Sequence, residues 1–322
     1  MHLFPNPLNT NRTSLSSDFA RSRLLNFPRL SAPCGTKHFA CLVITILSMG
    51  INSMALMAAP IQIETVLVGD AGNANDSTGY GAVSYEYHIG KYPVTNAQYT
   101  TFLNAVAASD PHGLWNSSMG TNVHGGISRS GSDGSYMYDV RSATEGFNEG
   151  QSMADMPVNY VSFWSAARFA NWLTTGETET GVYDLGGVTN PSNSTITRDE
   201  TAWTNGGVAI TSENEWYKAA YYDPTLDGGA GGYWLFPTRS NTAPISMGPN
   251  NTDTNSANYT INGPNTVTPV GGYELASSHY GTFDQGGNVW EWNDEIVSDS
   301  FRRWRGGSFN FAHFASYLGS ET

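Results

Sequence analysis

The sequence has few cysteines: of 322 residues only Cys34 and Cys41 carry a thiol. Everything after Cys41 therefore lacks the means to form a disulfide, a thiolate metal site or a cysteine nucleophile. Charged residues are also scarce, at 13% of the chain, which argues against a long coiled coil or a charged disordered protein.

Basic residues are the scarcer of the two charge types, with 15 Lys and Arg against 28 Asp and Glu, a formal charge of −13. Nucleic-acid binding needs clustered Lys and Arg, so we expect no nucleic-acid partner. Glycine is abundant at 35 residues, and nine tryptophans provide apolar mass for a core. The composition indicates a loop-rich globular domain whose irregular backbone is held by side-chain hydrogen bonds.

The first 58 residues have the layout of a secretory signal region. A basic part is followed by an apolar run at residues 39–49 and by small residues at 55–59. The run is short for a membrane span, so we expect cleavage near Ala58 or Ala59 and no membrane span afterwards. An uncleaved N-terminal anchor is the alternative. Residues 60–322 would then carry 10 Lys and Arg against 27 Asp and Glu, a formal charge of −17.

Three helices are predicted by their starting signals. Thr95 with Gln98 and Ser212 with Glu215 have the spacing of capping boxes, and Ser162 can cap a third helix that ends before Gly176. Strands are predicted at residues 61–68 and 85–89, and short aromatic strands at 233–236, 289–292 and 304–309. The long stretches at 113–150 and 176–207 are expected to be irregular, and such loops are usually functional.

Five short motifs occur in order along the chain. They are YPVTNAQY at 92–99, MPVNYVSFW at 156–164 with NWL at 171–173, TSENEW at 211–216, YGTFDQGGNVWEW at 280–292, and RGGSF at 305–309. Together they resemble the formylglycine-generating enzyme family, also called the sulfatase-modifying factor domain, over residues 85 to 320. The resemblance implies an α+β fold of the C-type-lectin-like, formylglycine-generating-enzyme type, loop-rich with a small irregular sheet. The domain is expected to occupy residues 60–322.

The resemblance also implies where catalysis should reside. Active members oxidise a substrate cysteine to formylglycine with two cysteines that bind copper(I) after the RGGS motif. Those positions are Phe311 and Ser316 here, and neither side chain is a suitable copper(I) ligand. We therefore expect no copper and no formylglycine-generating activity, which makes the chain a pseudoenzyme.

Another branch of the family carries variable ligand-binding residues after RGGS. The corresponding stretch here is rich in aromatic and amide side chains, a composition that suits recognition. The alternative is that Phe309 and Phe311 are core residues. The candidate ligand-binding residues are Asn310, Phe311, His313, Phe314, Ser316 and Tyr317.

The family often holds calcium near the GNVWEW motif, and calcium prefers six to eight oxygen ligands. The resemblance points to the Asp284 and Glu291 carboxylates with the carbonyls of Gly287 and Val289. A second site would lie at Asn258 and the Tyr259 carbonyl, with Asn262 as a further ligand. The alternative is that these acids cap backbone amides and turns. One or two Ca²⁺ ions are thus expected.

The leading functional prediction is a secreted, periplasmic or cell-surface protein that binds an extracellular protein, peptide or glycan without catalysis. One alternative is an oxidoreductase that acts on protein cysteine through an unrecognised site, and another is a structural extracellular module. Family members usually continue into an Arg-bearing strand, whereas this sequence stops at Thr322. This departure from the family pattern raises two hypotheses, that the chain is a truncated product or that it is a frameshifted one.

Overall fold

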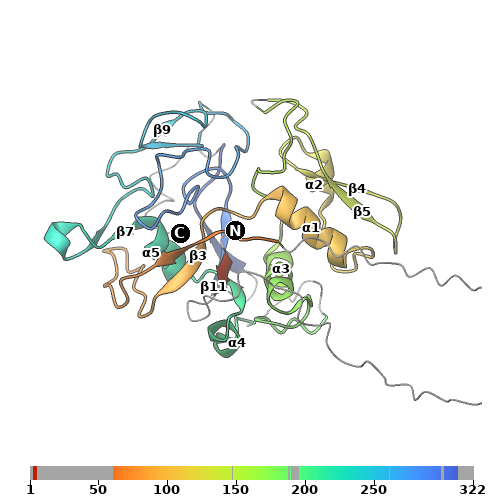
Figure 1. The fold of residues 1–322 in the computed structure, drawn as a ribbon, viewed down its shortest axis with the longest axis horizontal. Coiled ribbons are helices and arrows are strands. Elements are labelled where there is room, and N and C mark those ends of the chain that lie inside the picture. The colour runs from red at the N-terminus through yellow and green to blue at the C-terminus, as the bar shows by residue number, and fades with distance from the viewer. Residues whose placement is uncertain are drawn as a thin grey trace, which may run out of the picture. The chain divides into compact units, whose positions relative to one another are not determined.

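The structure is a computed structural model that describes residues 3–5, 61–146, 148–187, 189, 196–260, 262–298 and 301–310. All of these residues belong to one compact unit (Figure 1). Within these ranges, no helix has both the length and the apolar character needed to cross a membrane.

The three longer helices begin where the sequence predicts them. Helix α1 (Asn96–Val106) and helix α5 (Glu213–Tyr221) each start at a complete capping box, formed by Thr95 with Gln98 and by Ser212 with Glu215. Such a box satisfies backbone N–H groups that a helix start leaves without partners.

Helix α3 (Phe163–Thr175) is capped by the Ser162 side chain and ends at Gly176. Gly176 has φ +83°, a left-handed conformation that glycine adopts without a Cβ clash. The predicted N-cap and C-terminal glycine of this helix are therefore confirmed.

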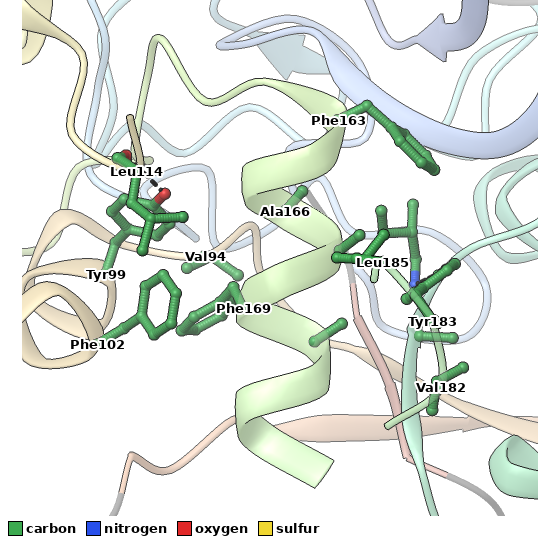
Figure 2. Close-up of a cluster of buried hydrophobic side chains, with 14 of the residues drawn as sticks. Val94, Tyr99, Phe102, Leu114, Phe163, Ala166, Phe169, Val182, Tyr183 and Leu185 are labelled. Atoms are coloured by element: carbon green, nitrogen blue, oxygen red, sulfur yellow. Dashed lines mark hydrogen bonds between the residues drawn. The ribbon is translucent and has the colours of Figure 1, made fainter. Parts of the chain in front are cut away.

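Helix α3 is the centre of the main hydrophobic core, which Figure 2 shows. On one side its Phe169 ring packs against Tyr99 and Phe102 of α1, with ring centroids 5.7 Å and 5.2 Å away. On the other side lie Val182, Tyr183 and Leu185 from the loop after α3. The loop is therefore ordered by its own buried side chains.

The strands form six two-stranded pairs in the described part of the chain rather than one continuous sheet. Together with the helices they make the loop-rich α+β architecture that the sequence predicts. The pairs are β1 (Leu3–Pro5) with β6 (Val208–Ile210), β2 (Thr65–Val68) with β3 (Tyr87–Gly90), β4 (Ile127–Ser130) with β5 (Met137–Val140), β7 (Tyr222–Asp223) with β8 (Gly232–Tyr233), β9 (Ile245–Ser246) with β10 (Ser256–Ala257), and β11 (Glu291–Ser298) with β12 (Phe301–Arg305).

The two stretches expected to be irregular contain more regular structure than predicted. The first holds the short helix α2 (Ser117–Thr121) and the β4–β5 hairpin, and the second holds helix α4 (Glu200–Thr204). These elements have only four or five residues each, too few to show a clear hydrophobic period in the sequence.

The β11–β12 hairpin differs from its predicted bounds. Strand β11 begins at Glu291 rather than at residue 289, and β12 ends at Arg305, where residues 304–309 were expected to form a strand. Gly306 and Gly307 follow with φ +95° and +73°, values that stop the extended conformation. This turn brings Phe309 back beneath Asn288, whose carbonyl accepts a hydrogen bond from the Phe309 N–H at 3.0 Å.

Strand β1 lies in the segment that the sequence predicts to be removed. Leu3 pairs with Ile210 and Pro5 with Val208 in an antiparallel register. Cleavage near residue 58 would therefore take β1 away from β6.

Candidate functional site

The first turn of α5 fixes the β11–β12 hairpin through two buried contacts. Glu213 accepts a hydrogen bond from the Arg305 Nε atom at 2.8 Å, and both side chains are about 5% exposed or less. Trp216 donates its indole Nε1–H to the Glu291 Oε2 atom at 2.7 Å. The hairpin is thus held at its base by the ion pairs of Glu213 with Arg305 and, at 3.5 Å, with Arg303, and by one hydrogen bond to the buried Glu291 carboxylate.

A pocket of about 880 Å³ opens beside this hairpin. Its walls come from four separate parts of the chain: the loop after α2, the turn before α3, the motif around Asn288 with β11, and β12 with the residues that follow it. The lining residues are Asn122, His124, Asn159, Tyr160, Val161, Asn288, Val289, Trp290, Trp292, Trp304, Ser308, Phe309 and Asn310.

Aromatic rings form much of the pocket wall. The Trp292 and Trp304 rings meet edge to face at 5.5 Å and 80°, and the Trp304 side chain is 47% exposed. Trp292 is anchored because its Nε1–H donates to the Val161 carbonyl at 2.9 Å. Elsewhere in the lining, the His124 ring lies 4.5 Å from the Phe309 ring.

Tyr160 has an unusual backbone conformation at the pocket wall. Its φ is +63°, in the left-handed region that non-glycine residues enter at a cost, and its side chain is 37% exposed. Strained residues of this kind tend to occur at functional sites.

The pocket is electrically neutral in its described lining, which contains no Asp, Glu, Lys or Arg. Its one titratable imidazole, His124, has a pKa lowered by burial, with Glu145 opposing the shift. The ring therefore stays uncharged at neutral pH. A neutral pocket in a strongly acidic domain disfavours charged ligands, since nothing in its described lining can balance their charge.

Of the predicted ligand-binding residues, the structure describes only Asn310. It lines the pocket, and its Oδ1 atom accepts a hydrogen bond from Ser308 Oγ at 3.0 Å. The assignment of Asn310 as a ligand contact stays a prediction. The other predicted residues, Phe311, His313, Phe314, Ser316 and Tyr317, lie outside the described residues, and so do the family cysteine positions Phe311 and Ser316.

Sequence reasoning did not find the lining residues that precede α3 in the chain. Asn122, His124 and Tyr160 belong to segments more than 120 residues away from Trp292 and Trp304. No spacing rule joins such distant segments. The only sequence signal was the excess of tryptophan in the GNVWEW motif.

Asp284 and Glu291 are the buried carboxylates of the predicted calcium site. Asp284 accepts the Gly271 N–H at 2.6 Å, and burial raises the pKa of Asp284 to about 7 against the effect of that bond, with the Glu291 charge adding to the rise. Burial likewise raises the pKa of Glu291. Among the described residues no group of three or more His, Cys, Asp or Glu is placed to hold a metal ion, so a calcium site here would depend on these two carboxylates together with carbonyls such as those of Gly287 and Val289, and it stays a prediction.

The three residues of the second predicted calcium site differ in whether their oxygen atoms are available to bind an ion. Asn258 is buried and donates its amide to the Thr266 carbonyl at 2.8 Å and to Asn288 Oδ1 at 3.2 Å, while its own Oδ1 accepts no hydrogen bond from the described residues. The Tyr259 carbonyl already accepts a hydrogen bond from Ser246 Oγ. Asn262 is exposed and caps a turn by donating its N–H to Thr260. Among these three residues, the Asn258 Oδ1 atom is thus the one buried oxygen that is free to bind a metal ion.

These features define a loop-rich α+β domain with a neutral aromatic pocket beside a carboxylate pair. The chain belongs to the FGE-sulfatase family, described as the sulfatase-modifying factor enzyme 1-like domain, which matches residues 68–319. A solved structure, the crystal structure of CarF, is 18% identical and has a TM-score of 0.43; the match covers 80% of this chain and 91% of that one. No curated protein matches the sequence.

The buried pair between Glu213 and Arg305 gives a stability prediction. Glu213→Gln should lower the free energy of unfolding by about 3–5 kcal/mol, because it leaves a buried guanidinium without its countercharge. Glu64→Gln is the matched control, since Lys91 and Glu64 are also 2.8 Å apart but Glu64 is 60% exposed. That change should cost less than about 1 kcal/mol. Urea denaturation measures both, and equal losses would contradict the argument.

Proposed function

We propose that this member of the family is an exported binding module that holds an uncharged ligand in the aromatic pocket and does not generate formylglycine. The observation that carries the proposal is the neutral lining of the pocket, in which tryptophan rings and amide side chains converge. Aromatic anchors with a few placed polar groups are typical of ligand-binding pockets. Export is supported by the signal-like layout of the first 58 residues.

The donor chemistry of the sequence opposes the catalytic alternative. Copper(I) prefers thiolate ligands, and no cysteine occurs after Cys41. The family cysteine positions hold Phe311 and Ser316, so the side chains there do not fit copper. No step of thiol oxidation through a bound copper ion can therefore be derived for this chain.

A calcium ion at the Asp284 and Glu291 pair would complement the pocket. Its role would be structural, because both carboxylates lie outside the described pocket lining while Asn288 and Val289, between them in sequence, belong to it. The ion would offset the desolvated charge of the pair and so fix the turn that carries part of the pocket wall.

Binding through the pocket predicts a sensitivity to Trp304. On arrays of glycans and peptides, the protein should bind at least one probe, and Trp304→Ala should weaken that binding about tenfold or more by removing an aromatic anchor. Phe301→Ala is the matched control, because Phe301 lies on the same strand, is 62% exposed and does not line the pocket. Binding that survives Trp304→Ala, or a folded protein that binds no probe, would refute pocket binding.

The absence of copper-ligating thiols predicts no aldehyde product. Incubating the purified protein with a cysteine-containing sulfatase peptide, copper(I) and oxygen should leave the peptide mass unchanged and yield no hydrazide-reactive aldehyde. An active member of the family, assayed in parallel, controls for the reagents. Aldehyde formation above the no-protein background would contradict the pseudoenzyme assignment.

The calcium proposal predicts that Asp284→Asn stabilises the protein without calcium but weakens its stabilisation by calcium. Wild-type protein should unfold about 5–10 °C higher in millimolar calcium than in EDTA, if the free ion exceeds its Kd about a hundredfold. Asp284→Asn keeps an acceptor for Gly271 but removes a buried charge, so it should raise the midpoint in EDTA and shrink the calcium shift. Differential scanning calorimetry measures both. Identical wild-type midpoints in EDTA and in calcium would remove the site.

A further inference from the structure

We propose that the ligand of the pocket is a neutral saccharide, bound by stacking on Trp304 and Trp292 and by hydrogen bonds to the asparagine side chains around them. This inference rests on the proposed binding function and narrows it to one chemical class. Four properties of the pocket support it: the geometry of the rings, the state of the amide groups, the absence of charge in the described lining, and the shortage of aliphatic side chains.

The indole pair offers a stacking platform. Trp292 is fixed by its bond to Val161, and its ring meets Trp304 nearly at a right angle, so the half-exposed Trp304 ring is held in a defined position. A pyranose ring carries a face of C–H bonds that packs against the electron-rich face of an indole. An exposed but supported tryptophan at a pocket is therefore suited to a sugar ring.

The amide groups are partly engaged and partly available. Asn159 donates its Nδ2–H to the His124 carbonyl at 3.2 Å, while in the described residues its Oδ1 atom has no donor. Asn310 accepts from Ser308 through Oδ1, which leaves its Nδ2 donors available. One partner is thus an acceptor and the other a donor. A sugar hydroxyl both donates and accepts, so such a pair matches it.

The charge of the pocket lining and of the domain favours neutral sugars over acidic ones. The described lining has no Lys or Arg to bind a carboxylate or sulfate group, and residues 60–322 carry a formal charge of −17. The negative net charge repels sialylated or sulfated glycans, and the described lining offers their charges no partner. Cationic ligands lack a carboxylate partner in the same lining.

Side-chain type separates a sugar from an apolar peptide. Val161 and Val289 are the only aliphatic residues in the described lining, which has no Leu, Ile or Met. A hydrophobic peptide anchor gains most from a closely packed aliphatic pocket, whereas aromatic faces alternating with amides match rings that are apolar on one side and polar at the edge. A volume of about 880 Å³ lies in the range of small-ligand pockets.

The test is a glycan array followed by isothermal titration calorimetry with the full chain. Neutral oligosaccharides should bind and sialylated or sulfated ones should not. Trp304→Ala should weaken binding about tenfold or more, Asn310→Ala by a smaller factor, and Phe301→Ala not at all. Because the ligand carries no charge, affinity should stay constant between low and high sodium chloride.

Three results would overturn the saccharide assignment. The first is binding confined to charged glycans. The second is neutral-glycan binding that Trp304→Ala leaves intact. The third is binding of peptides alone, lost in Trp304→Ala, which would keep the proposed binding function and remove only the sugar. A folded protein that binds neither glycans nor peptides would remove both, so the two failures remain distinguishable.

Discussion

Two buried glutamates at the start of α5 hold together parts of the chain that no local interaction joins. Glu213 pairs with Arg305 at the end of β12, and Glu215 binds Arg198 through two hydrogen bonds at 2.8 Å and 2.9 Å. Glu215 also accepts from Ser212 N–H and from Tyr85, just before β3. A buried charge tolerates only a fully bonded arrangement, so these residues select one placement of the surrounding loops.

The pocket depends on that placement. Trp292 and Trp304 lie on β11 and β12, and this hairpin is fixed at its base by Glu213 and by the Trp216 contact to Glu291. Another part of the lining comes from the turn at Tyr160, which leads directly into α3 and the main core. The turn and the hairpin are joined directly, because the Trp292 Nε1–H donates to the Val161 carbonyl at 2.9 Å. An aromatic site gains from such support because its rings need little reordering on binding.

Sequence reasoning succeeded where the physical cause is local. The capping residues Thr95 and Ser212 act within one helical turn, so their spacing alone predicted α1 and α5. It failed where the cause is distant. Nothing near Trp304 in the sequence indicates that it is half-exposed beside a pocket, because part of the pocket lining comes from residues 122–161. The family resemblance supplied the fold and the carboxylate pair, but it did not supply the neutral character of the pocket.

The motif residues that identify the family stabilise the loops through contacts that involve no cysteine. Asn288 accepts the Thr268 N–H and donates to the Thr268 carbonyl, which joins two loops in the way a strand pairing would. Gly306 takes a positive φ where a Cβ would meet the Gln285 carbonyl at 2.9 Å. These contacts do not depend on which residues occupy positions 311 and 316. A match to the motifs therefore predicts the scaffold, while activity depends on the few side chains that the scaffold presents.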